Sequence, residues 1–156
     1  MNDYLPPDIT AQLLLSFPAL RLYALCTILL VLKMHAVGIA TGVARTRAKV
    51  TMNPEDAARY NAQASDVDPP EVARALRAHR NDLENIPPFL LLALVGVLVG
   101  AAPLGLKITL IAFTAARVGH SIAYLRSMQP WRSITFGVGQ LCVLALVVMI
   151  LLRIVP

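Results

Sequence analysis

Four polar residues near the middle of the chain have a spacing that would place them on one helix face. Arg77, Arg80, Asn81 and Glu84 fall at positions i, i+3, i+4 and i+7, and residues with this spacing are neighbours on a helix surface. Guanidinium groups bind carboxylates through paired hydrogen bonds, whereas a carboxylate suits an ammonium group. The stripe is therefore suited to a small zwitterion with several carboxylates. Asp82 lies off this stripe.

A second polar stripe lies in the segment ARVGHSIAYL, where Arg117, His120 and Tyr124 fall at i, i+3 and i+7. A lone histidine in an apolar helix is more often structural than functional. Three polar groups on one face of an otherwise apolar segment instead favour a binding site. We therefore expect this stripe to belong to the same site as the first.

Polar residues also open the last apolar segment, which begins WRSITF. Arg132 and Ser133 lie at its start, and Phe136 and Gln140 continue the face of Ser133. A guanidinium and a hydroxyl group placed together can stabilise an anion by charge and by hydrogen bonding. These residues are therefore candidates for the same site.

The composition is typical of a membrane protein. Hydrophobic residues make up 57% of the 156 residues and charged residues only 15%, against about 25% charged in ordinary globular domains. The mean hydropathy is +0.65. The net charge of +5 does not indicate nucleic-acid binding, since no motif of that kind occurs. Cys26 and Cys142 lie inside apolar segments without metal-ligand spacing, so we interpret them as apolar filler.

Four apolar segments are long enough to cross a bilayer core of about 30 Å. The predicted spans are about residues 19–42, 71–100, 104–128 and 131–154, and a hydrophilic connection covers about 44–70. The acidic lead, residues 1 to about 16, lacks the basic region of a signal peptide. The sequence thus predicts one all-α integral membrane domain over residues 1–156, folded as a four-transmembrane-helix bundle.

Several residues inside the predicted spans need a structural explanation. Lys33 would lie at mid-depth, where a lipid-facing helix avoids charge, so we expect it to pair within the bundle or to snorkel towards the interface. Gly38 and Gly42 would admit a close neighbouring helix. Pro87 and Pro88 each remove a backbone donor and should kink the second span.

The hydrophilic connection contains a helix-start signal. Asn53 suits the N-cap, Pro54 the first helical position, and Glu55 and Asp56 the first turn. Helix initiation is a sufficient reason for an acid at Asp56. A catalytic carboxylate is the alternative.

Basic residues predict the orientation of the chain. The first and third connections contain or adjoin most of them: Arg45, Arg47, Lys49, Arg59, Arg126 and Arg132. By the positive-inside rule these connections face the cytoplasm and both termini face away, so the polar stripes meet at the cytoplasmic end. Arginines there outnumber the acids Asp56, Asp82 and Glu84, and such an excess implies an anionic ligand. A bundle with purely structural ion pairs is the alternative.

Four segments together resemble one known family. NPEDA, RAHRNDLENIPPF, RVGHSIAYL and WRSITF are similar in order and spacing to the MAPEG family, the membrane-associated proteins of eicosanoid and glutathione metabolism. The resemblance covers about residues 19–150. It implies a homotrimer of four-helix subunits that binds glutathione between neighbouring subunits, near the cytoplasmic side. The composition, rich in Ala, Leu and Arg, and the short connections suit a bacterial inner membrane as well as the endoplasmic reticulum.

The resemblance also assigns roles to residues of this chain. Arg45 matches the arginine that ends the first helix, Arg117 matches a position near the site, and Phe136 and Gln140 match the substrate cavity. Asp56 matches an acid proposed to assist the chemistry. The implied glutathione-binding set is Arg45, Arg77, Arg80, Asn81, Glu84, His120, Tyr124, Arg132 and Ser133.

The implied chemistry is activation of the glutathione thiol. A free thiol has a pKa of about 8.5, so only a few per cent is thiolate at pH 7, and a nearby guanidinium favours the anion. We expect Arg132 to stabilise the thiolate and Ser133 to donate a hydrogen bond to sulfur, with Asp56 as a third catalytic candidate. No metal is expected.

The leading expectation is a glutathione-dependent membrane transferase or peroxidase that acts on lipophilic electrophiles or hydroperoxides. The alternative is a prostaglandin-endoperoxide isomerase of the microsomal prostaglandin E synthase type. A non-enzymatic partner protein requires a degraded arginine stripe, and here the stripe is complete. Phe136 stands where the synthase pattern has tyrosine, and LENIPPF is nearer the transferase form, whereas Arg132 and Ser133 are nearer the synthase form.

Overall fold

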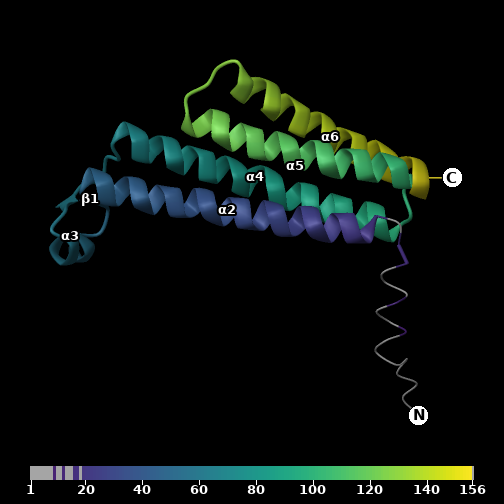
Figure 1. Ribbon diagram of the computed structural model, residues 1–156, viewed down its shortest axis with the longest axis horizontal. Coiled ribbons are helices and arrows are strands. Elements are labelled where there is room, and N and C mark those ends of the chain that lie inside the picture. Colours follow the sequence, from purple (N-terminus) through teal and green to yellow (C-terminus); the bar gives the residue numbers. More distant parts are fainter. Residues whose placement is uncertain (1–8, 10–11, 13–15, 18, 156) are drawn as a thin grey trace, which may run out of the picture.

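Four long helices form the body of the protein in the computed structural model, which describes residues 9, 12, 16, 17 and 19–155. They are α2 (Leu20–Ala48), α4 (Pro70–Leu98), α5 (Pro103–Leu125) and α6 (Trp131–Ile154). The chain reverses direction from each of these helices to the next (Figure 1). All four are long and apolar enough to cross a membrane. Most of the expected lead, residues 1 to 16, lies outside the described residues.

Two helices differ in detail from the predicted spans. α2 continues beyond residue 42 to Ala48, since no glycine or proline interrupts the segment after Gly42 and the basic side chains of its last turn favour a helix C-terminus. α4 begins at Pro70 and ends at Leu98, whereas the predicted span covers about residues 71–100. Pro87 and Pro88 lie inside this helix and do not end it.

A small folded connection joins α2 to α4 at one end of the bundle (Figure 1). It contains β1 (Val50–Thr51), α3 (Pro54–Tyr60) and β2 (Gln63–Ala64), and the two strands pair in parallel. Asn53 occupies the predicted N-cap position, but its side chain makes no capping bond. Its Nδ2 instead donates to Asp56 Oδ2 at 3.0 Å, so this amide orients the carboxylate.

At the end of the bundle opposite this connection, a side-chain hydrogen bond joins α6 to the end of α4. Arg153, near the end of α6, donates from Nε to the carbonyl oxygen of Val99 at 3.0 Å. Val99 directly follows α4, where helix carbonyls lack partners within the helix. The bond therefore ties the last turn of α6 to the end of α4.

Gly38 allows α2 and α4 to approach closely, as the sequence predicts. A Cβ atom at Gly38 would lie 3.3 Å from His79 Cε1, so the imidazole of His79 occupies the space that the missing side chain leaves. The pairing of Lys33 within the bundle is also confirmed, because its ammonium group contacts the carboxylate of Asp82.

Replacing Gly38 with leucine is expected to destabilise the bundle by about 1–3 kcal/mol, the usual cost of overpacking a close contact. Thermal unfolding of the detergent-purified protein would measure the loss. Gly137→Leu is the matched control, because a Cβ atom there also meets open space in the described part of the chain and Gly137 does not line the cavities described below. An equal loss of stability in both variants would contradict the assigned contact.

Candidate functional site

A polar cavity lies where the α5–α6 turn approaches α4. Its volume is about 290 Å³, and it is lined by Asn81, His120, Tyr124, Arg132, Ser133 and Phe136. These residues come from three helices, α4, α5 and α6. The structure therefore brings together six of the residues that the sequence singles out.

Arg132 is held against the aromatic wall of this cavity. Its Cζ atom lies 4.9 Å from the centroid of the Tyr124 ring, within the range of a cation–π interaction. The carbonyl oxygen of Arg132 lies 3.0 Å from His120 Nδ1. Because a carbonyl only accepts, Nδ1 carries the hydrogen of the neutral imidazole.

That tautomer leaves His120 Nε2 as an acceptor. His120 is only 3% exposed, and Nε2 has no hydrogen-bond partner among the described residues. A buried polar atom without a partner is costly. The ring of His120 lines the cavity, but Nε2 itself is covered by protein atoms.

The other members of the cavity wall are less constrained. The Ser133 hydroxyl lies 3.2 Å from the side-chain amide of Gln129, and Phe136 lies with its ring centroid 6.0 Å from that of His120. Ser133 and Phe136 are both exposed on the single subunit. The wall that they form is therefore accessible from outside the bundle.

Only one residue of the first polar stripe lines this cavity. Asn81 lines it, whereas Arg77, Arg80 and Glu84 are exposed on the outer surface of α4. Arg80 Nε donates to Glu84 Oε1 at 3.0 Å, an i,i+4 pair of the kind that exposed helices form. Within one subunit these three charges thus face away from the bundle.

Gln140 lies one helical turn beyond Phe136 on α6. It is exposed, and its Nε2 donates to Asn85 Oδ1 at 2.7 Å. This bond joins α6 to α4 beside the cavity. The structure therefore places Gln140 next to the cavity wall rather than among the six residues that line it.

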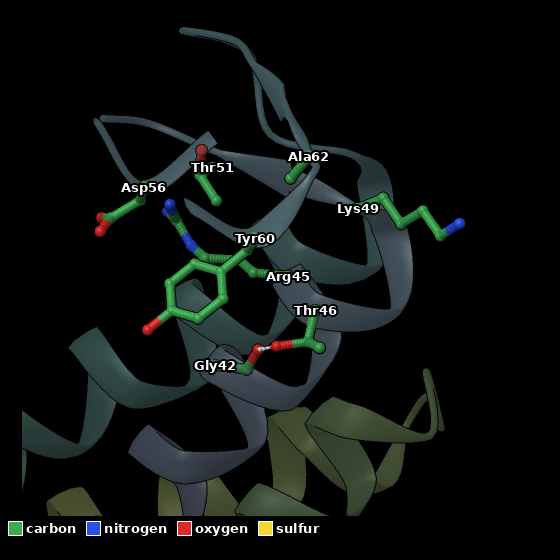
Figure 2. Close-up of a pocket in the computed structure, with 8 residues that line it drawn as sticks. All are labelled: Gly42, Arg45, Thr46, Lys49, Thr51, Asp56, Tyr60 and Ala62. Atoms are coloured by element: carbon green, nitrogen blue, oxygen red, sulfur yellow. Dashed lines mark hydrogen bonds between the residues drawn. The ribbon is translucent and has the colours of Figure 1, made fainter. Parts of the chain in front are cut away.

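Arg45 and Asp56 line a different cavity. Its volume is about 460 Å³, and its walls are Gly42, Arg45, Thr46, Lys49, Thr51, Asp56, Tyr60 and Ala62. Figure 2 shows the Arg45 side chain extending from α2 towards the side of this cavity that carries Asp56 and Tyr60. Arg45 Nη2 also lies 3.1 Å from Asp68 Oδ1, so part of the expected excess of positive charge is neutralised.

A buried ion cluster between three helices was only partly foreseen. Asp82 is fully buried and contacts Lys33 of α2 and Arg117 of α5. Sequence reasoning placed Arg117 in the second stripe near the site, but its guanidinium packs inward, 1% exposed, against this carboxylate. The signal available was the charge of Lys33 at mid-depth, which requires a partner.

No group of three or more His, Cys, Asp or Glu side chains that could hold a metal ion occurs among the described residues. Cys26 and Cys142 are both buried and unpaired with each other. The cavity beside Arg132 offers hydrogen-bonding and cationic groups.

Four helices able to span a bilayer, with a polar cavity at one end, define an integral membrane protein. The profile of the MAPEG family matches residues 23–152. The chain belongs to the MAPEG family, as its four motifs suggest, and members of this family use glutathione.

Two kinds of relative are similar to this chain over most of its length. Prostaglandin E synthase of Homo sapiens is 44% identical over 131 residues, which cover 83% of this chain and 86% of that protein. Prostaglandin E synthase of Equus caballus is 42% identical over 138 residues, or 88% of this chain and 89% of that protein. Microsomal glutathione S-transferase 1 of Homo sapiens is 40% identical over 112 residues, or 69% of this chain and 72% of that protein.

Proposed function

We propose that this protein is a glutathione-dependent membrane isomerase of the prostaglandin E synthase type, acting on a lipophilic endoperoxide. The observation that carries the proposal is the cavity that Arg132, Ser133, Tyr124 and His120 line together. The relatives support an isomerase over the transferase expected from sequence, because the two synthases are 44% and 42% identical to this chain over 131 and 138 residues and the transferase is 40% identical over 112.

The residues of the cavity fit glutathione by the chemistry of their side chains. When bound, glutathione supplies a thiol whose anion is a strong nucleophile. The Arg132 guanidinium favours that anion by its charge, and the Ser133 hydroxyl can donate to sulfur. The Tyr124 ring holds the guanidinium in place, and the ring of His120 completes the wall beside it.

The remaining candidate residues fit a site shared between subunits. Arg77, Arg80 and Glu84 face outward on α4, and Arg45 and Asp56 line a separate cavity on the same subunit. We infer a homotrimer in which Arg45 and Asp56 of one subunit approach the Arg132 cavity of its neighbour. The outward charges would then face the neighbouring subunit and the carboxylates of glutathione, near the cytoplasmic side of the membrane.

A glutathione transferase or peroxidase is the second candidate. Phe136 supports it, because the phenyl ring presents no hydroxyl group to the cavity that it lines with Arg132 and Ser133. The same thiolate would attack a lipophilic electrophile or hydroperoxide dissolved in the bilayer. A non-enzymatic role has less support, since Arg77, Arg80 and Glu84 are all present.

The two reactions differ in what they consume. An isomerase returns glutathione unchanged, whereas a transferase consumes one glutathione for each product molecule. We expect the detergent-purified protein to convert prostaglandin endoperoxide to its isomer in a glutathione-dependent manner, without loss of thiol, and Phe136→Tyr to raise that rate severalfold. Assays with endoperoxide, a hydroperoxide and a halogenated aromatic electrophile, each with thiol titration, would test this. Conjugation without isomerisation would overturn the first candidate, and no turnover in any assay would overturn both.

A further inference from the structure

Three charged side chains from three helices meet in the bundle core. The carboxylate of Asp82, on α4, contacts the ammonium group of Lys33 on α2 and lies 2.9 Å from Arg117 Nη2 on α5. Ser121 Oγ donates to the second carboxylate oxygen at 3.4 Å. Asp82 and Arg117 are 0% and 1% exposed. Two cations share one carboxylate, so the cluster carries one net positive charge.

Arg117 connects this cluster to the cavity. The same Nη2 that donates to Asp82 also donates to Asn81 Oδ1 at 2.5 Å. A guanidinium has only donors, so the Asn81 atom that faces it is the oxygen, and the amide nitrogen is turned away from Arg117. Asn81 lines the cavity together with Arg132.

Stability alone is a poor reason for such a cluster. Removing three charged groups from water costs more than their mutual attraction often returns, and apolar replacements of buried ion clusters are frequently neutral or stabilising. In a membrane segment the cost is larger still, and ionisable residues there usually serve a function. The only residue outside the cluster that Arg117 contacts by a described hydrogen bond is Asn81.

We propose that Asp82 and Arg117 are positioning residues of the glutathione site. Asp82 holds Arg117, and Arg117 holds the oxygen of the Asn81 amide, so that the two N–H donors of Asn81 are presented to an acceptor on bound glutathione. Lys33 is not assigned a positioning role, because its described hydrogen bond and ion pair are both made to Asp82 and neither reaches Asn81. This inference rests on the proposed function, since it concerns the same ligand.

Equilibrium binding of radiolabelled glutathione to the detergent-purified full chain tests the inference without requiring turnover. The test variant replaces all three charges with apolar residues (Lys33→Met, Asp82→Leu and Arg117→Met), which leaves no unpaired charge in the core. Its Kd for glutathione is expected to rise about tenfold, the effect of losing one hydrogen bond to a charged ligand. Lys33→Met alone is the control and should stay within about twofold of wild type, because the Asp82–Arg117 pair remains.

A double-mutant cycle with Asn81→Ala separates positioning from a general structural effect. If the cluster acts through Asn81, the apolar replacement will raise Kd little further once Asn81 is alanine. Independent effects, which multiply to about a hundredfold, would overturn the inference, as would an unchanged Kd in the apolar variant. Should that variant not fold, Arg117→Lys keeps the charge and loses the planar fork. It should weaken binding in the wild-type background and not in Asn81→Ala.

The outcomes also separate this inference from the proposed function. A wild-type protein that binds glutathione but shows independent effects in the cycle would refute the positioning role and leave the proposed function standing. A wild-type protein that binds no glutathione would refute both.

Discussion

Replacing Arg132 with alanine is expected to lower kcat/KM for the glutathione-dependent reaction by about 10²–10³-fold, the effect of removing one preorganised group that stabilises a developing anion. Arg132 is the only cation that lines the cavity among the described residues, and the Tyr124 ring fixes its position. Without it the bound thiol would ionise less readily. The ultraviolet absorbance of the thiolate in the glutathione complex should fall in parallel with the rate.

The matched control for this variant is Arg126→Ala. Arg126 directly follows α5, is exposed and does not line the cavity, so its loss removes the same charge without changing the site. Thermal stabilisation by excess glutathione should also diminish in Arg132→Ala and persist in the control. If Arg132→Ala lost stability with and without glutathione while turnover per folded molecule stayed constant, a purely structural role would explain the residue.

Mixing two inactive variants is expected to restore activity. Arg45→Ala and Arg132→Ala should each be nearly inactive alone, because Arg45 and Arg132 line different cavities of one subunit and a shared site would need both. In a cyclic trimer formed from equal amounts of the two, about a quarter of the subunit boundaries combine an intact Arg45 with an intact Arg132. Co-expression with two affinity tags, followed by sequential purification and an assay, would measure the recovery.

A second mixture controls for trivial rescue. Arg132→Ala combined with the double variant Arg45→Ala/Arg132→Ala contains no intact Arg132, so it should remain inactive. If the first mixture were no more active than its components, the site would lie within one subunit. The inferred approach of Arg45 to the neighbouring cavity would then be wrong.

The helices and the cavity wall could be anticipated because both depend on local spacing. Apolar runs predict the four long helices, and a helical period predicts that His120 and Tyr124 lie on one side of α5. Their meeting with Arg132 follows, because the short α5–α6 turn brings the end of one helix beside the start of the next. These relations extend over a few residues and need no knowledge of distant contacts.

The interior of the site could not be anticipated in the same way. Asp82 directly follows Asn81 in the chain, yet its side chain lies in the core, where Lys33 and Arg117 contact it from two other helices. The partner of Arg45 lies in the loop before α4, at Asp68. Which of several acids neutralises which arginine depends on tertiary packing, and a count of charges along the sequence does not contain that information.

The bond from Arg153 to the Val99 carbonyl has a consequence for how a lipophilic substrate gains access. It holds α6 against α4 at the end opposite the α5–α6 turn, and the Gln140–Asn85 bond holds the same two helices together beside the cavity. A substrate dissolved in the bilayer would have to break both bonds to pass between α4 and α6. The exposed wall of Ser133 and Phe136 offers a route that leaves both bonds intact.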